Sequence, residues 1–457
     1  MKWRSGLVSL TITTLLVVGL APAADATEAG HHTGQLPGGA TWVADVPESW
    51  NGTIILYSHG FGPLVAQDAP DAATATALLA GGYALVGSSY SGPSWWALES
   101  AVGDQFGALA ALEAKIGAAE RTIAWGTSMG GLVSAREAED PHRRIDGALT
   151  TCGLVAGALN LDDYQLHGEY ALSHLLAPEQ AIKLVRYGSQ DEAAAAAATL
   201  SEVTSDAQAT PAGRARIALA AALMNVPTWY TGAAPPAPRD YETQEAQQER
   251  TLAGFVLGFV MTGRYQIELA AGGNSAATRG TDYRALFGGS SHAQQVRTLY
   301  RRAGLNLDAD LAKLSRDADI TADPGAVAAL ARTSVPTGRL RVPELAIHTV
   351  ADQLVPVEQE NWYARRVAAA GTGHLLRQAF VQGTGHCAFQ PAETIAALHA
   401  LEARVSTGRW GGGAEPERLN AAAGTGRYVR FEVPHLVGAV SNAKVRGSGI
   451  EGGRRDG

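Results

Sequence analysis

A serine near residue 130 lies in a motif whose glycines suit a tight turn. The motif is Gly126-Thr127-Ser128-Met129-Gly130. An apolar stretch at 121–125 precedes it and a helix-forming stretch at 130–137 follows it. In such a G-x-S-x-G elbow the turn raises the serine hydroxyl above a sheet, and the flanking positions, here Gly126 and Gly130, must be small. Because the helix N-terminus behind the turn also favours negative charge, we predict that Ser128 is a nucleophile and not part of an ordinary structural turn.

A histidine and an acid follow two later strand-like segments. His386 lies in a Gly-rich loop after the apolar run 376–381, and Asp352 follows the apolar run 345–348. His386 is in a position to reach a serine above the same sheet edge and act as general base, although local backbone hydrogen bonds would also suit it. Asp352 fits the acid that orients the histidine. The same position suits a helix cap, and Glu358 is the alternative acid.

An earlier glycine-containing loop matches a source of oxyanion donors. The loop is His59-Gly60-Phe61-Gly62, directly after the apolar run 53–57. In this kind of site one backbone N–H comes from such a loop and the other from the residue after the nucleophile. We therefore assign the two donors to Phe61 and Met129. An ordinary glycine turn, with the histidine bonded to nearby backbone, is the alternative.

The elements that must position these residues alternate along the chain. Apolar runs typical of buried strands occur at 42–46, 53–57, 83–87, 121–125, 145–151, 345–348 and 376–381. Helical segments are expected at 71–80, 97–116, 130–137 and 392–405. This alternation predicts an α/β protein with a mostly parallel sheet flanked by helices and joined by right-handed crossovers.

The alternation is interrupted by a long helical block at 154–341. We interpret it as a large α-helical cap insertion over the ligand-binding edge of the sheet, with an independent helical domain as the alternative. The catalytic core then comprises 41–153 and 342–407. The segment 27–39 is expected to be a loose leader. The C-terminal extension 408–457 is expected to be partly disordered, with an extended piece at 428–433 and disorder at 447–457.

The chain order Ser128, Asp352, His386 is the order of the α/β-hydrolases. Together with the elbow and the loop at Phe61, it makes the chain resemble the α/β-hydrolase superfamily, and more narrowly secreted bacterial serine hydrolases or esterases with a large helical cap. The His386-Cys387 pair is also similar to tannases and feruloyl esterases, in which a cysteine beside the serine bonds to one beside the histidine. Here Thr127 precedes the serine, which departs from that pattern.

The sequence contains two cysteines, Cys152 and Cys387. Cys152 ends the strand-like run 145–151, next along the chain after the nucleophile strand, so it is expected at the same sheet edge as the His386 loop. In an oxidising compartment an even count favours a disulfide. We predict that the two are bonded, with two separate buried thiols as the alternative.

The composition and the N-terminal segment indicate the class of protein and where it works. The 457 residues are 46% hydrophobic and 18% charged, with a net charge of −8. This fits a globular protein and argues against nucleic acid as a partner. Basic residues, a short apolar run and small-residue cleavage sites at 1–26 predict a signal peptide, with a membrane anchor as the alternative. The mature protein is expected to be secreted and free of the membrane, and no metal, phosphate or dinucleotide motif predicts a cofactor.

The predicted function is hydrolysis of a carboxylic ester, small or polymeric, through an acyl-enzyme. A peptidase or amidase is the first alternative, for which the acidic residues Glu242, Glu245 and Glu249 would bind a substrate amine if they did not simply form a solvated helix face. An acyltransferase and a non-enzymatic binding module are the others. Four aromatic residues are candidates for the pocket but suit core packing better: Trp95, Trp96, Trp229 and Tyr230.

Overall fold

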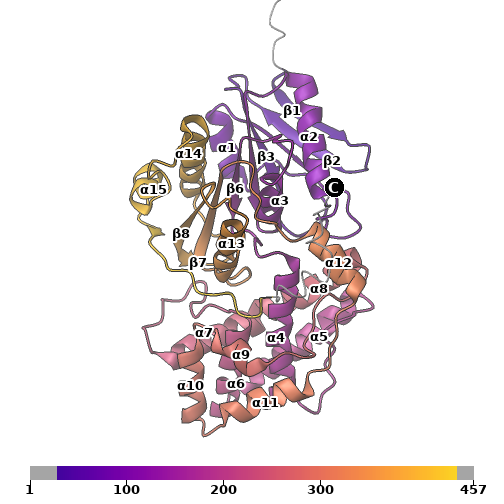
Figure 1. Ribbon diagram of the computed structural model, residues 1–457, viewed down its shortest axis with the longest axis vertical. Helices are drawn as coiled ribbons and strands as arrows, with labels where there is room; N and C mark the ends of the chain where they lie inside the picture. The colour runs from indigo at the N-terminus through magenta and orange to yellow at the C-terminus, as the bar shows by residue number, and fades with distance from the viewer. Residues whose placement is uncertain (1–27, 440–457) are drawn as a thin grey trace, which may run out of the picture.

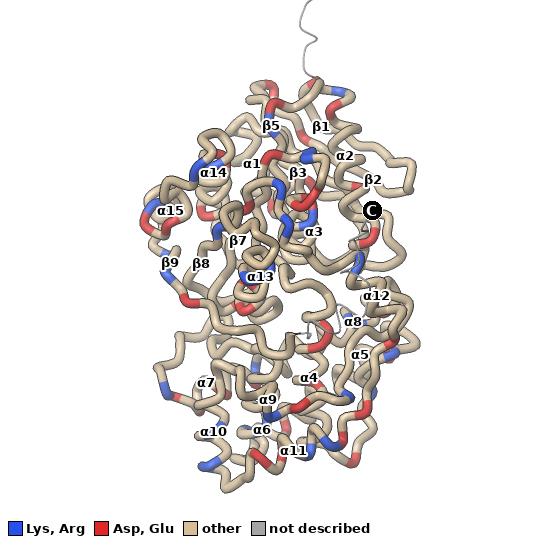
Figure 2. Tube along the Cα trace, in the orientation of Figure 1, with Lys and Arg blue, Asp and Glu red and all other residues tan. Residues whose placement is uncertain are grey.

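The computed structural model describes residues 28–439. The predicted signal peptide at 1–26 and the predicted disorder at 447–457 lie outside these residues. None of the helices in the described range is both long and apolar enough to cross a bilayer. Basic and acidic residues are intermixed along both halves of the molecule (Figure 2).

A mixed sheet forms one half of the molecule (Figure 1). Within residues 28–439 it has nine strands in the order β1-β2-β4-β3-β5-β6-β7-β8-β9. The six strands from β4 to β8 in that order are parallel, and β1, β2 and β9 are antiparallel to their neighbours. The strands are β1 Gly30–Gln35, β2 Thr41–Val46, β3 Thr53–Ser58, β4 Ala84–Ser88, β5 Arg121–Thr127, β6 Gly147–Thr151, β7 Glu344–Ala351, β8 Leu376–Thr384 and β9 Tyr428–Val429.

Helices cover both faces of this sheet because its central strands are apolar on both sides. All six residues of β3 are buried. Ile54 packs in a cluster with residues of α2, α3 and α13, whereas Ile55 packs on the opposite face with residues of α1, α14 and α15. These helices are α1 Ala72–Ala80, α2 Ala101–Ile116, α3 Met129–Glu137, α13 Glu358–Ala369, α14 Pro391–Thr407 and α15 Pro416–Ala423. The predicted α/β fold is confirmed.

A helical layer, here called the insert, separates β6 from β7 and forms the other half of the molecule (Figure 1). It comprises α4 Ala158–Leu176, α5 Gln190–Ala207, α6 Pro211–Leu223, α7 Tyr241–Thr251, the π-helical turn η1 Leu252–Val256, α8 Leu257–Ala271, α9 Tyr283–Gly288, α10 Ala293–Arg302, α11 Leu307–Asp317 and α12 Pro324–Thr333. Its apolar core is continuous with Trp96 and with Met129 at the start of α3. The insert therefore packs at the edge of the sheet where α3 begins.

The N-terminal leader is ordered as a strand, and the chain after β9 packs against the rest of the molecule. The leader predicted to be loose contains β1, which pairs with β2, and His31 Nδ1 lies 2.8 Å from Asp45 Oδ1. That prediction was wrong because an edge strand is held by backbone hydrogen bonds and needs no alternation of apolar residues.

After β9 the chain runs past α13 to the insert. There the Val437 N–H donates to Asn225 Oδ1 at 2.9 Å, and Asn225 Nδ2 donates to the Val437 carbonyl oxygen at 3.0 Å.

Candidate active site

The turn between β5 and α3 has the strained backbone that the elbow motif requires. Ser128 has φ 59° and ψ −121°, in a region that non-glycine residues seldom adopt. A Cβ on Gly126 would lie 1.8 Å from the Gly130 carbonyl oxygen, and one on Gly130 would lie 1.9 Å from the Ser58 oxygen. Both positions must therefore be glycine for the helix to start this close to the sheet.

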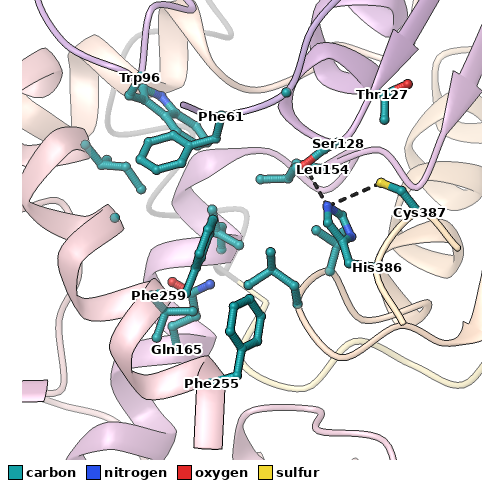
Figure 3. A pocket seen from close by; sticks show the side chains of 17 residues that line it. Phe61, Trp96, Thr127, Ser128, Leu154, Gln165, Phe255, Phe259, His386 and Cys387 are labelled. Atoms are coloured by element: carbon teal, nitrogen blue, oxygen red, sulfur yellow. Dashed lines mark hydrogen bonds between the residues drawn. The ribbon is translucent and has the colours of Figure 1, made fainter. Parts of the chain in front are cut away.

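The structure brings the three predicted side chains into one hydrogen-bonded row at the ends of β5, β7 and β8. Ser128 Oγ is 2.8 Å from His386 Nε2, and His386 Nδ1 is 2.8 Å from Asp352 Oδ2 (Figure 3). The hydroxyl donates to Nε2 and the Nδ1–H donates to the carboxylate. This is the geometry in which an imidazole removes the serine proton while a carboxylate fixes its tautomer.

Asp352 serves as cap and partner at once. Its Oδ1 accepts from the backbone N–H groups of Leu354 and Val355, both at 2.9 Å, while its Oδ2 accepts from His386. Burial alone would raise the pKa of Asp352, but attraction to His386 and His348 and the hydrogen bond from His386 hold it well below the usual range. The alternative acid, Glu358, is the first residue of α13, and burial raises its pKa to about 7.

The loop after β3 lies against the serine. A Cβ on Gly60 would be 3.3 Å from Ser128 Cβ and 3.7 Å from its Oγ, so the backbone at Gly60 and Phe61 passes beside the hydroxyl. Met129 opens α3, where a first-turn N–H has no acceptor within the helix. His59 stacks on Tyr90 with ring centroids 4.2 Å apart, and its Nδ1 donates to the Gly60 oxygen at 2.8 Å. His59 is thus bonded to nearby backbone, as the alternative expected, and its loop also lies next to Ser128.

A disulfide joins Cys152, after β6, to Cys387, next to His386. Cys387 Sγ lies 3.4 Å from His386 Nε2. Cys152, His386 and Cys387 have the residue types of a metal site and lie close enough for one, but both sulfurs are consumed by the disulfide and are not available as thiolates. Thr127 Oγ1, where tannases have a cysteine, is 2.9 Å from Thr151 Oγ1 instead.

The double variant Cys152→Ala/Cys387→Ala is expected to lower the free energy of unfolding by ~3–5 kcal/mol, because the link joins residues 235 positions apart and restricts the unfolded chain. Urea unfolding followed by tryptophan fluorescence measures the difference. A reductant should reproduce the loss in the wild type and change nothing in the variant. Identical midpoints for the two proteins would contradict a stabilising role.

A second histidine that sequence reasoning passed over stands behind Asp352. The His348 ring is fully buried, with Nδ1 3.0 Å from Glu360 Oε1 and Nε2 2.9 Å from the Val355 carbonyl oxygen. Both partners accept, so the ring carries both protons. Burial by itself lowers the pKa of His348, but Asp352 and Glu360 outweigh burial and raise this pKa to about 10. No short-range pattern marks His348, since its partners meet it only in the folded chain.

We expect the pair formed by His348 and Glu360 to make the free energy of unfolding depend on pH. Because the His348 pKa is raised on folding, its stabilisation is complete below the unfolded value of about 6.5 and is lost as pH rises through about 10. The advantage of the wild type over His348→Gln/Glu360→Gln in unfolding free energy should therefore shrink between pH 7 and 10. Urea titrations at several pH values measure it, and comparing the two proteins cancels other groups. A constant difference would contradict the assignment.

A cavity of about 370 Å³ opens beside the serine, between the sheet edge and the insert. Its walls include Leu354, Phe61 and Trp96 from the sheet half and residues of α4, η1 and α8 from the insert (Figure 3). Trp96 lines the cavity and is also a buried member of the apolar core, as expected. Trp229 lies elsewhere, with its Nε1 donating to the Ala233 oxygen at 2.9 Å.

Four aromatic rings contact one another in a chain, and three of them, Phe61, Phe259 and Phe255, line the cavity. Their centroids are 5.9 Å apart for Trp95 and Phe61, 5.8 Å for Phe61 and Phe259, and 5.6 Å for Phe259 and Phe255. Phe255 is carried by the π-helical turn η1 and is 49% exposed. Such turns often occur at functional sites, and here the turn places a ring at the mouth of the cavity.

The acidic residues considered for binding an amine are engaged elsewhere. Glu242 pairs with Arg302, Glu249 accepts from Ser205 at 3.1 Å, and Glu245 accepts from Gln208 at 3.2 Å. Burial raises the pKa of Glu245 to about 8. Among the described residues that line the cavity, none of these three occurs.

Comparison with known proteins finds a relative that matches most of the chain. The chain is 31% identical over 434 residues to an o-phthalyl amidase from Xanthobacter agilis, covering 87% of this chain and 92% of the relative. No family model matches the sequence.

Among solved structures, an esterase from Aspergillus oryzae is 15% identical with a TM-score of 0.41, covering 81% of this chain and 77% of that chain. A proline iminopeptidase from Mycobacterium smegmatis is 14% identical with a TM-score of 0.37, covering 82% and 100%. A puromycin hydrolase is 14% identical with a TM-score of 0.35, and its match covers 92% of this chain but 42% of that chain.

Proposed function

The chain belongs to the same family as the o-phthalyl amidase of Xanthobacter agilis, among the hydrolases of the α/β-hydrolase fold, and we propose that it is a serine hydrolase that cleaves carboxylic esters. The observation that carries this proposal is the row Ser128–His386–Asp352, with both contacts at 2.8 Å, at the wall of a cavity. A hydroxyl, an imidazole and a carboxylate in this order are what acyl transfer through a serine needs.

In the proposed mechanism His386 Nε2 takes the Ser128 proton as Oγ attacks the carbonyl carbon of the substrate. The backbone N–H groups of Met129 and Phe61 are assigned to the carbonyl oxygen, which becomes an oxyanion. Asp352 holds the Nδ1–H of the imidazole and stabilises the imidazolium that forms. Two bonds to backbone N–H groups keep the Asp352 carboxylate in place during this step.

The tetrahedral intermediate collapses when His386 returns the proton to the leaving oxygen, which departs as an alcohol and leaves an acyl group on Ser128. A water molecule then gives its proton to His386 and attacks the acyl carbon. The second intermediate collapses as His386 returns this proton to Ser128 Oγ, which releases a carboxylic acid and restores the Ser128 hydroxyl. His386 keeps its Nδ1–H bond to Asp352 throughout, while Nε2 exchanges a proton in turn with Ser128, the leaving oxygen and the water, so one imidazole suffices for both halves of the cycle.

Amide hydrolysis is the second candidate, and the relationship to an o-phthalyl amidase favours it. The same residues would act, with His386 protonating an amine instead of an alcohol. A peptidase that recognises a free amine is less well supported, because Glu242, Glu245 and Glu249 have other partners and stand outside the cavity lining.

The experiment that separates the two candidates uses one acyl group with two leaving groups. Initial rates are measured with the 4-nitrophenyl ester and the 4-nitroanilide of benzoic acid, for the wild type and for Ser128→Ala. The proposal expects the ester to be hydrolysed and the activity to vanish in the variant. Hydrolysis of the anilide at a comparable rate would assign the amidase function, and hydrolysis of neither would contradict both.

We also propose that the protein works outside the cytoplasm. Support comes from the disulfide next to His386, since such bonds persist in oxidising compartments. Fractionation of the native host, with an antibody against the protein, tests this location. Recovery of the protein from the cytoplasm alone would contradict the proposal.

A further inference from the structure

Three ionisable side chains form a buried row that begins at the acid of the triad. Asp352 Oδ2, which accepts from His386, also lies 3.6 Å from His348 Nε2. On its other nitrogen, Nδ1, the His348 ring lies 3.0 Å from Glu360 Oε1. Asp352, His348 and Glu360 are here called the buried row, and none of the three is more than 1% exposed. His348 therefore stands between two carboxyl groups, one of which belongs to the triad.

The hydrogen bonds of the buried row indicate where its protons are. His348 Nε2 is 2.9 Å from the Val355 carbonyl oxygen, which can only accept, so this nitrogen carries a hydrogen. A neutral ring would then need a protonated Glu360 to donate to Nδ1. The second oxygen of that carboxyl, Oε2, already accepts from the Gln378 amide at 2.5 Å, which favours the ionised form. His348 is therefore an imidazolium that donates to a carboxylate.

The other titratable groups that act on the buried row are uncharged in acid solution. They come from three elements, namely Glu358 of α13, Tyr164 of α4 and Glu344 of β7. Burial raises the pKa of Glu358 to about 7 and that of Glu344 to about 8, and it also raises the pKa of Tyr164. Below about pH 6 all three are protonated and neutral. The charges that remain are those of the buried row itself and of His386 once it takes up a proton.

We propose that His348 is a positioning residue of the triad, and that its fixed positive charge keeps Asp352 ionised and lets the enzyme work at a lower pH than the triad would alone. The inference rests on the serine hydrolase function proposed above and concerns the same site. A nearby cation opposes protonation of the coupled pair His386–Asp352, which would stop catalysis, so a more acid solution is needed to reach that state. Glu360 balances the cation and so limits the cost of burying it.

Two variants that change the charge of the buried row should move the acid limit of activity in opposite directions. kcat/KM for a 4-nitrophenyl ester is measured between about pH 4 and 9, and the midpoint of its fall on the acid side is compared with that of the wild type. In His348→Gln this midpoint should rise by about one pH unit, because the cation is lost. In Glu360→Gln it should fall by about half a pH unit, because the cation remains without its counter-charge.

A merely structural role gives a different result from a role through charge. Damage to the fold lowers kcat/KM at every pH and does not move the midpoint in opposite directions for two partners. The matched control is Glu358→Gln, which replaces another buried acid of α13 that is already neutral in the acid range. Its acid-side midpoint should equal that of the wild type.

Nitrogen NMR of the wild type reads the charge of His348 without any need for activity. The protein carries isotope-labelled histidine and is studied at about pH 8.5, where an ordinary histidine with a pKa of about 6.5 is neutral. We expect one ring with a hydrogen on both nitrogens, since burial lowers the pKa of His348 but Asp352 and Glu360 outweigh it and raise this pKa to about 10. The signals of this ring should be absent from His348→Gln/Glu360→Gln.

A neutral His348 ring in this spectrum would overturn the proposal, as would acid-side midpoints that stay unchanged or move in the same direction in the two single variants. Failure of the serine hydrolase function has a different signature. A fluorophosphonate would then not label Ser128 and no ester would be hydrolysed, whereas the spectrum would still report the charge of His348. Labelling of Ser128 together with a neutral His348 ring removes the present inference alone.

Discussion

Ser128→Ala is expected to lower kcat for a 4-nitrophenyl ester by on the order of 10⁵- to 10⁶-fold. The hydroxyl is the group that lies 2.8 Å from His386 Nε2 at the top of the elbow, so the variant lacks the atom that forms the acyl-enzyme. Alanine keeps the Cβ and the backbone position, and the fold should therefore be retained. Single-turnover and steady-state rates on purified protein measure the loss.

A matched control for this variant is Ser134→Ala, in α3. Ser134 Oγ is buried and contacts the Gly131 oxygen and Thr150 Oγ1, both at 3.1 Å, and has no contact with the reacting atoms. Its loss should change kcat by less than about tenfold. Should Ser128→Ala retain activity near that of the control, the nucleophile has been assigned to the wrong residue.

Asp352→Asn is expected to lower kcat by about 10⁴-fold at neutral pH. An amide in this place still accepts the backbone N–H groups of Leu354 and Val355, so local structure should survive. It no longer provides a negative charge to stabilise the imidazolium, and an amide N–H facing His386 would favour the wrong tautomer. Steady-state kinetics with the same ester measure the effect.

Glu358→Gln serves as the control, because Glu358 is the alternative acid that the sequence offers for this role. Burial raises the pKa of Glu358 to about 7, and the carboxylate bonded to His386 belongs to Asp352. The Gln variant should keep kcat within a few fold of the wild type. A large loss in Glu358→Gln together with a small one in Asp352→Asn would exchange the two assignments.

The elbow, the acid and the histidine were predictable because each follows an apolar strand and precedes a helix start, which are short-range signals. The sequence alone did not decide whether Asp352 caps a helix or orients a histidine. The structure shows that it makes both sets of contacts, one with each carboxylate oxygen, so the two interpretations were never exclusive.

What the sequence missed depends on contacts between distant segments. His348 is the last residue of the apolar run 345–348, and its partner Glu360 lies on α13. Gln165 lies in a helix that is buried along nearly its whole length, so no amphipathic pattern indicates which of its faces meets the cavity. The strand β1 was missed because backbone pairing with β2, not side-chain pattern, holds it.

The Cys152–Cys387 bond also determines what a break in the main chain would do. Ser128 precedes Cys152, and His386 is the neighbour of Cys387, so the whole insert lies inside the covalent loop of 235 positions. A protease that cuts one peptide bond in a connection of the insert would leave nucleophile and base on one molecule. The two fragments would separate on a denaturing gel only after reduction. Refolding of the nicked protein would therefore remain a unimolecular reaction, because the disulfide keeps the two fragments together.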